Sequence, residues 1–283
     1  MKFHVIDAGR FKLDGGAMFG VVPKVLWNKL NPADENNMCT WALRCLLVEH
    51  EDRKILVDTG MGDKQDEKFR SHFYPHGNTD LVSSLREKGF EPGDITDVFI
   101  THFHFDHVGG AVKYDEEGKL VPVFPNAVYW TNEKHYEWAL NPNIREKPSF
   151  LKENFVPLAE AGVLRMIDET FKYKWMDRIN FRFYYGHTEA MLVPEFTMDN
   201  GKKLIYMADL MPSTAHVRLP WIMSYEIRPL ITLDERKIFY DRAIDEGSYL
   251  FLEHDPFHEV FTIAKDRKGR YGAGEILNLE DLT

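Results

Sequence analysis

The stretch THFHFDHVGG, residues 101–110, places three histidines and an aspartate within six consecutive positions. These residues are poor choices for a packed core, and the run ITDVFIT that leads into them is typical of a short buried strand. Residues two apart in an extended segment project to the same side, so His102 and His104 can face one point while Asp106 and His107 face a second. Imidazole and carboxylate are ligands of Zn²⁺ and related ions. The stretch therefore predicts part of a metal site at a strand end, with a solvated polar loop as the alternative.

The composition predicts an ordinary soluble globular protein. Of the 283 residues, 44% are hydrophobic and 28% are charged, and the formal net charge is −10. Because phosphate binding needs a basic face, this balance disfavours nucleic acid as a partner. No run of eighteen apolar residues occurs, so no membrane-spanning helix is expected. Cys39 and Cys45 lie outside any Cys-x-x-Cys pair and are expected to be reduced thiols.

The N-terminal stretch MKFHVIDAGRFKLDGG lacks the apolar region and the cleavage site of a signal peptide, so a cytoplasmic location is expected. No repeat or low-complexity linker divides the chain, and we expect a single domain over residues 1–283. A small-molecule substrate is the expected partner, without nucleic acid or membrane, and a homodimer stays open.

Strand and helix patterns alternate along the chain. The helical spacing of apolar residues within 78–89 and 234–245 predicts two helices. The MDNG turn between 191–197 and 203–207 is typical of a hairpin. Polar clusters stand directly after several predicted strands, which is how an α/β scaffold presents a site. Further expected elements are strands at 2–10, 41–50, 54–59, 95–101, 127–131 and 249–253, two or three strands within 165–185, and a helix at 133–140.

Three more candidate ligands follow predicted strands. His187 stands in GHT after FRFYY, Asp209 follows KKLIYMA, and His254 follows YLFLE. An acidic residue at such a place is costly unless it is paired or bound to a metal. Two ions need about three or four protein ligands each. With the four residues of the loop at 102–107, these positions would complete a set of five imidazoles and two carboxylates.

At these residues the sequence resembles the metallo-β-lactamase-fold hydrolases. The resemblance extends over most of the chain, and the stretches that carry it are ILVDTG at 55–60, THFHFDHVGG at 101–110, GHT at 186–188, YMADL at 206–210 and LEH at 252–254. It implies an α/β fold, a four-layer αββα sandwich in which two mixed sheets have helices outside and the metal site lies at the sheet edge.

The resemblance also assigns the ligands. The implied sets are His102, His104 and His187 for one ion, Asp106, His107 and His254 for the second, and Asp209 as the bridge between them. Asp58 in LVDTG matches a position that hydrogen-bonds the cluster loop and orients ligands. The implied cofactors are two divalent metal ions, with Zn²⁺ expected and Mn, Co or Fe as alternatives.

Within the family, several branches are disfavoured by single residues. Diiron oxidoreductases of this fold usually carry Glu at the position of His104. The β-lactamases use a late cysteine ligand or lack the carboxylate found here at Asp209, and glutathione thioesterases rely on a basic cluster for which no motif is found. HFHFDH is similar to the N-acyl-homoserine lactonases, whereas FPNAVYW, ERKIFYDRAIDEGSYLFLEH and RKGRYG resemble the methyl-parathion hydrolases.

The resemblance implies a dinuclear-metal hydrolase in which a metal-bridging hydroxide opens a lactone or cleaves a carboxyl ester with an apolar acyl or aryl group. The expected catalytic residues are Asp106, Asp209 and Tyr225. Lactonases often place a tyrosine three residues after the bridging aspartate, where this sequence has Pro212; Tyr225, His216 or Tyr206 would have to replace it. The alternatives are an organophosphate hydrolase and, in another class, a redox or metal-binding protein without hydrolytic activity.

The apolar segment 15–30 includes GGAMFGVVPK, whose Gly and Pro residues predict an irregular loop. Such a loop at the mouth of a cleft would suit an acyl chain or an aryl group. The alternative is that its side chains pack against the sheet. The expected substrate-binding residues are Met18, Phe19, Trp27, Trp221 and His216. Histidines without a partner motif are expected to be structural: His4, His50, His72, His76, His135 and His258.

Overall fold

The computed structural model describes residues 1–168 and 173–282. The chain forms two compact units, and each unit is made of two separate stretches of sequence. The first unit comprises residues 1–9 and 43–177, and the second comprises residues 10–42 and 178–283. The single domain expected from the sequence stays a prediction.

The sheet that lies mostly in the first unit is mixed, and its strands β1 and β2 continue into the second unit. Strands β2 and β3 form an antiparallel hairpin, and β3, β4, β7 and β8 run parallel to one another. Because parallel strands end at the same edge, the segments after β3, β4 and β7 are neighbours. In sheet order the strands are β1 (Lys2–Asp14), β2 (Met38–His50), β3 (Arg53–Val57), β4 (Asp97–Phe99), β7 (Val128–Thr131) and β8 (Leu164–Met166).

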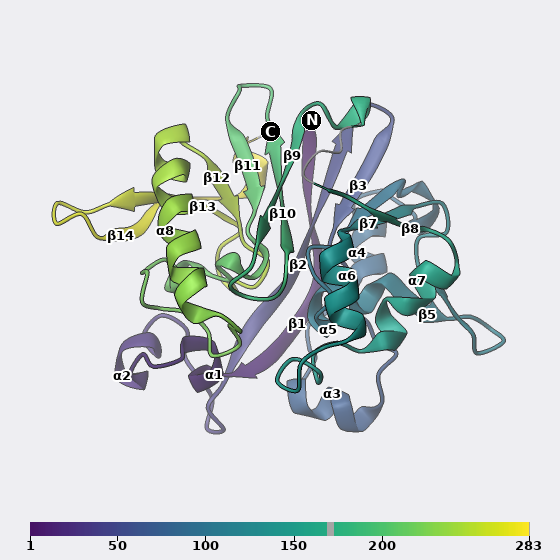
Figure 1. Ribbon diagram of the computed structural model, residues 1–283, viewed down its shortest axis with the longest axis horizontal. Coiled ribbons are helices and arrows are strands. Elements are labelled where there is room, and N and C mark those ends of the chain that lie inside the picture. The colour runs from purple at the N-terminus through teal and green to yellow at the C-terminus, as the bar shows by residue number, and fades with distance from the viewer. Residues whose placement is uncertain (169–172, 283) are drawn as a thin grey trace. The chain divides into compact units, whose positions relative to one another are not determined.

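Helices of the first unit pack against this sheet through one apolar cluster (Figure 1). Leu56 and Val98 of the strands share the cluster with Leu85 of α4 and Leu158 of α7. The Asp80 side chain begins α4 by accepting two backbone N–H groups, as expected for an N-cap aspartate. The elements outside the sheet are α3 (Glu67–Phe73), α4 (Leu81–Glu87), α5 (Phe105–Val108), β5 (Val112–Tyr114), β6 (Leu120–Pro122), α6 (Glu133–Leu140) and α7 (Val156–Glu160).

The sheet of the second unit is also mixed. Its strands β11 and β12 are parallel, and the other neighbours along it are antiparallel. In sheet order they are β14 (Tyr271–Leu277), β13 (Val260–Lys265), β12 (Tyr249–Phe251), β11 (Lys203–Tyr206), β10 (Met191–Thr197) and β9 (Ile179–Tyr184). The helices of this unit are α1 (Gly15–Phe19), α2 (Lys24–Trp27) and α8 (Pro229–Glu246).

Helix α8 packs on the second sheet (Figure 1). It has a proline in its first turn and ends at Gly247, whose φ of 60° is left-handed. Its buried face includes Phe239, whose ring lies edge-on to Tyr184 of β9 at 6.3 Å. Arg242 on the helix forms an ion pair with the buried Glu195 of β10.

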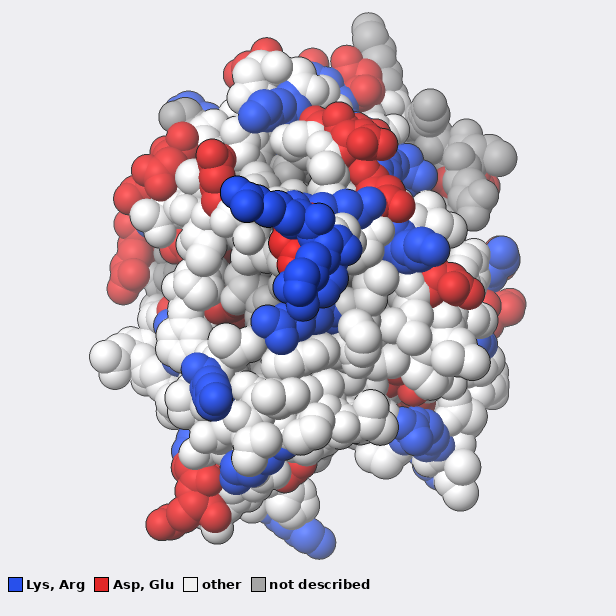
Figure 2. Space-filling view, turned by 90° about the vertical axis from the view of Figure 1, so that its left-hand side faces the viewer, with Lys and Arg blue, Asp and Glu red and all other residues white. Residues whose placement is uncertain are grey.

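Lysine and arginine side chains lie beside acidic ones on the face shown in Figure 2.

Most predicted elements are present, and two segments differ from the expectation. Segment 15–30 was predicted to be irregular, which is wrong, because α1 and α2 lie in it. Asp14 caps α1 by accepting the N–H of Ala17, a local contact that the Gly-rich composition hides. Segment 165–185 contributes β8 to one sheet and β9 to the other, and its residues 169–172 lie outside the described residues.

Within residues 1–168 and 173–282, no helix combines the length and the apolar character needed to cross a membrane.

Candidate metal centre

Asp58 organises the histidine loop of the first unit. It lies directly after β3 and is fully buried. Its Oδ1 accepts the backbone N–H of Thr101 at 2.8 Å, and its Oδ2 accepts the Thr101 hydroxyl at 2.7 Å. The same Oδ2 lies 3.1 Å from Nδ1 of His107. A carboxylate that contacts one imidazole nitrogen orients the ring and makes the opposite nitrogen a better ligand. Asp58 thereby fixes the start of the histidine loop at Thr101 and orients the ring of His107 in the same loop.

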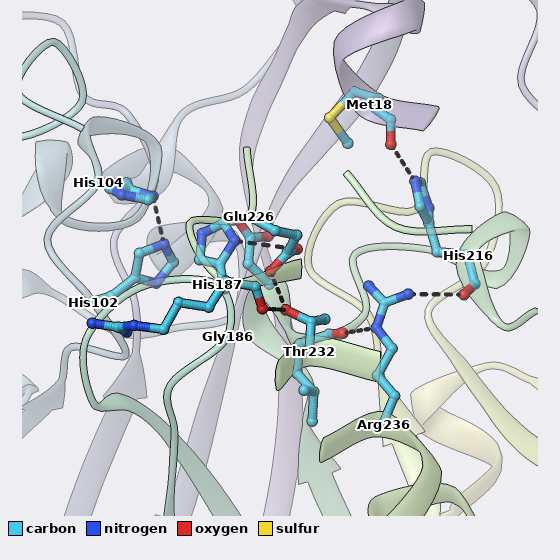
Figure 3. A network of polar contacts seen from close by, with 12 residues as sticks. Met18, His102, His104, Gly186, His187, His216, Glu226, Thr232 and Arg236 are labelled. Carbon is cyan, nitrogen blue, oxygen red and sulfur yellow. Dashed lines mark hydrogen bonds and ion pairs between the residues drawn. The ribbon is translucent and has the colours of Figure 1, made fainter. Parts of the chain in front are cut away.

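His102 and His104 face each other (Figure 3). Nε2 of His102 lies 3.1 Å from Nδ1 of His104, and both residues are buried. Their opposite nitrogens contact other groups: Nδ1 of His102 is 3.0 Å from the Thr101 hydroxyl, and Nε2 of His104 is 3.7 Å from Oε1 of Glu146. Glu146 also accepts the indole N–H of Trp138 at 2.9 Å. Two facing imidazole lone pairs repel unless a proton or a cation lies between them, so this pair suits a metal ion.

His135, a histidine expected from the sequence to be structural, also holds the loop. Its Nε2 accepts the backbone N–H of Phe103 at 2.8 Å, between the two facing histidines. The rings of Phe103 and His135 stack with centroids 5.2 Å apart. His135 lies in the first turn of α6, which follows β7, the parallel neighbour of β4. The pairing of β4 with β7 brings His135 to Phe103, and no motif near position 135 signals it.

Gly109 and Gly110 allow a close approach of two backbone segments. A Cβ on Gly109 would lie 2.0 Å from the carbonyl oxygen of Met61, and one on Gly110 would lie 2.1 Å from that of Thr59. Thr59 in turn donates its backbone N–H to the carbonyl of His107 at 2.8 Å. The glycine pair therefore seats the loop against the turn after β3.

The second unit contributes three candidate ligands around one carboxylate. His187 follows β9, Asp209 follows β11 and His254 follows β12. Oδ2 of Asp209 lies 3.1 Å from Nε2 of His187, and its Oδ1 lies 3.3 Å from Nε2 of His254. The Nδ1 atom of His254 lies 2.8 Å from the carbonyl oxygen of Ala42. The Asp209 carboxylate thus faces an imidazole nitrogen on each side.

The electrostatics of this carboxylate favour positive charge beside it. Burial disfavours the protonated form of His187, but the carboxylates of Asp209 and Glu226 outweigh burial and raise the pKa of His187 to about 10. The two carboxylates that raise this pKa would also attract a divalent cation, which would have to displace the proton from His187. Glu226, whose Oε1 is 3.5 Å from Nδ1 of His187, was missed from the sequence.

The donor set fits transition-metal ions. One nitrogen of each of the five histidines faces an orienting oxygen, so the opposite nitrogen is the candidate ligand atom. Asp106 adds a carboxylate with Oδ2 at 3.9 Å from Nε2 of His107. The buried residues that could hold metal ions are Asp58, His102, His104, Asp106 and His107 in the first unit and His187, Asp209, Glu253 and His254 in the second.

The predicted substrate-binding rings are packed together in the second unit. Phe19 stacks on Trp27 at 5.0 Å and on His216 at 4.6 Å. Phe19, Trp27 and His216 are at most 2% exposed. Neighbouring rings cover these side chains, which is the packing alternative raised for this segment, and their contact with a substrate stays a prediction. Met18 and Trp221 are buried as well, and their contact with a substrate stays a prediction.

The candidates to replace the tyrosine missing at Pro212 lie in different environments. Tyr206 is fully buried on β11 and stacks on Phe251 at 5.5 Å, so it is a core residue. His216 has Nδ1 2.7 Å from the Ser213 hydroxyl and Nε2 2.9 Å from a backbone carbonyl, which occupies both nitrogens. Tyr225 is 38% exposed and remains the accessible candidate.

Comparison with known proteins gives one family match. The model of the metallo-β-lactamase superfamily matches residues 44–171. An N-acyl homoserine lactonase of Bacillus cereus is 28% identical in a match that covers 48% of this chain and 61% of that protein. The chain therefore spans less than two thirds of that relative's length.

Solved structures resemble the chain over nearly its whole length. A crystal structure of a probable metal-dependent hydrolase from Staphylococcus aureus has a TM-score of 0.85 and 26% identity, and the match covers 98% of both chains. AidC, described as a dizinc quorum-quenching lactonase, has a TM-score of 0.79 and 24% identity over 98% of this chain and 95% of its own. The likeness to AidC is one of fold.

Proposed function

The chain carries a metallo-β-lactamase superfamily domain and has the mixed α/β fold predicted for it, and from this premise we propose that it is a metal-dependent hydrolase of lactones or carboxyl esters. The observation that carries the proposal is the donor set: buried imidazoles and carboxylates, each imidazole oriented by an oxygen behind it. Such a set is typical of metal centres, hydrolytic ones among them, rather than of a packed core.

The resemblance to the metallo-β-lactamase-fold hydrolases supplies the ligand sets of the proposal. The proposed ligands are His102, His104 and His187 for one ion, Asp106, His107 and His254 for the other, and Asp209 for both. When bound, two divalent ions polarise a carbonyl oxygen and lower the pKa of water. Zn²⁺ is the proposed metal, because imidazole and carboxylate are its usual ligands beside thiolate.

The chain's own residues would orient the reactants. Asp106 presents a carboxylate that can accept a proton from water during attack. Tyr225 is 38% exposed, and its phenol would donate to the oxyanion, a role that Pro212 cannot perform. The lactonase relatives support a lactone as substrate and an apolar acyl group beside it.

A substrate panel tests the proposal. The zinc-loaded protein is assayed with an N-acyl homoserine lactone, a γ-lactone, a p-nitrophenyl ester and paraoxon. Hydrolysis of the lactones or the ester, lost on chelation and restored by Zn²⁺, Mn²⁺ or Co²⁺, supports it. Turnover of paraoxon alone would make the protein an organophosphate hydrolase, and redox-active iron without any hydrolysis would place it outside the class.

Two variants and a matched control accompany the panel. His102→Ala and Asp209→Ala should lose metal and activity together. His76→Ala replaces an exposed histidine of the first unit and should keep both. A His102→Ala protein with full metal content and full turnover would overturn the ligand assignment.

A further inference from the structure

Glu226 directs one carboxylate oxygen at a candidate metal ligand. The residue lies just before α8 and is 2% exposed. Its Oε2 accepts the hydroxyl of Thr232 at 2.7 Å. Its Oε1 is 3.5 Å from Nδ1 of His187 and accepts no hydrogen bond from residues 1–168 or 173–282 (Figure 3). The helix therefore fixes one oxygen, and the other faces the ring.

The charge of Glu226 needs compensation that the helix does not provide. Burying a carboxylate is unfavourable unless a cation or a donor lies against it. In the described part of the chain, no lysine or arginine forms an ion pair with Glu226. Arg228, its neighbour in sequence, instead contacts Glu189 and the carbonyl of Tyr185. Among the described residues, the imidazole of His187 is thus the group that can compensate the charge of Glu226.

The backbone around His187 is held by other contacts. Arg228 donates its N–H to the carbonyl of Gly186 at 2.9 Å. The Glu235 carboxylate accepts the N–H groups of Tyr185 and Gly186 at 2.6 and 3.0 Å. A Cβ on Gly186 would lie 2.2 Å from Oγ1 of Thr232, so only glycine lets the chain pass this close to α8. Glu226 therefore contacts the ring of His187, while Arg228 and α8 hold the main chain directly before it.

We infer that Glu226 is a positioning residue that holds the proton of His187 on Nδ1 and presents Nε2, the nitrogen facing Asp209, to a metal ion. The 3.5 Å separation is long for a hydrogen bond, and we expect it to shorten when a metal on Nε2 makes Nδ1–H more acidic. This inference rests on the proposed function in that it takes His187 as a ligand.

The test measures metal binding rather than turnover. Zn²⁺ affinity is determined by competition with a chromophoric chelator for the wild type, Glu226→Ala and Glu226→Gln. Glu226→Ala should weaken binding at the affected site by about 10–100-fold. Glu226→Gln keeps a carbonyl oxygen for Nδ1–H and an amide toward Thr232, so it should recover much of the affinity. The Co²⁺ absorption spectrum should change in Glu226→Ala and return toward the wild type in Glu226→Gln.

Glu195→Gln is the matched control, because Glu195 is a buried carboxylate of the same unit that pairs with Arg182 and Arg242. It should lower the unfolding temperature and leave Zn²⁺ affinity unchanged. A Glu226→Ala protein that loses stability like this control but binds Zn²⁺ as the wild type does would overturn the inference.

The outcomes separate this inference from the proposed function. A wild type that binds metal but hydrolyses nothing in the panel ends the substrate assignment, and the affinity comparison still decides the role of Glu226. If the wild type binds no metal, the proposed function fails, and the inference fails with it because it takes His187 as a ligand. If the wild type binds metal and hydrolyses a substrate of the panel while Glu226→Ala binds Zn²⁺ as tightly as the wild type, the proposed function stands and the inference alone fails.

Discussion

Oδ2 of Asp58 lies 3.1 Å from Nδ1 of His107, although 49 positions separate the two residues. Asp58 has a φ of 57°, in the left-handed region that asparagine also tolerates. The Asp58→Asn protein should therefore fold, while it loses the charge that orients His107. We expect a Zn²⁺ affinity lowered by about 10–100-fold, measured by chelator competition. Wild-type affinity in a folded Asp58→Asn protein would show that the contact is not used for metal binding.

Gly109 should not tolerate a side chain. Gly109→Ala places a Cβ 2.0 Å from the Met61 carbonyl oxygen, so the backbone must shift and the histidine loop with it. We expect a lower unfolding temperature and a reduced metal content, measured by calorimetry and elemental analysis. Gly272→Ala is the control, since nothing lies within 4 Å of its added Cβ. Equal behaviour of the two variants would contradict the close approach.

Arg236 should be essential for the loop after Asp209. Its guanidinium is fully buried on α8 and donates to the backbone carbonyls of Leu210, His216 and Trp221 (Figure 3). Arg236→Met leaves these acceptors unsatisfied, so we expect the free energy of unfolding to fall by about 3–5 kcal/mol in denaturant titrations.

The adjacent Lys237 is exposed, and Lys237→Met should change that free energy by less than about 0.5 kcal/mol. If the free energy of unfolding falls no more in Arg236→Met than in this control, the guanidinium does not stabilise the loop.

His216 should make the protein sensitive to acid. Burial lowers the pKa of His216 to about 3, and the nearby Arg236 adds to the effect. Between about pH 6.5 and pH 3 the unfolded chain takes up a proton at this position that the folded chain does not. The free energy of unfolding should therefore fall with falling pH, by at most about 1.4 kcal/mol per pH unit from this group.

Denaturant titrations of metal-free wild type and His216→Phe across this range measure the effect. Phenylalanine keeps the stack on Phe19 and cannot be protonated, so the variant should lose part of the pH dependence. Parallel curves for the two proteins would contradict a neutral buried His216.

Local sequence motifs are enough to predict most of the strands and the candidate ligands of this protein. Strand ends such as ITDVFIT and YLFLE were predicted because their apolar runs are continuous, and the residues after them became the candidate ligands. The predicted fold class was confirmed as well. A fold leaves its motifs at fixed places along the chain, so these motifs indicate the fold without knowledge of the contacts. The metal set itself stays a prediction for experiment.

Contacts between distant segments were decided only by the tertiary structure. His135 reaches Phe103 because β4 and β7 are parallel neighbours, and no pattern near position 135 encodes that pairing. Phe19, Trp27 and His216 looked like a cleft lining, but their rings stack on one another. The same apolar residue types occur in a packed core and in the lining of a substrate pocket, so residue type alone does not separate the two. Metal ligands, in contrast, occur at a characteristic spacing. The sequence by itself therefore determined the candidate ligands and the fold class, and the tertiary structure decided which groups orient those ligands and how the aromatic rings pack.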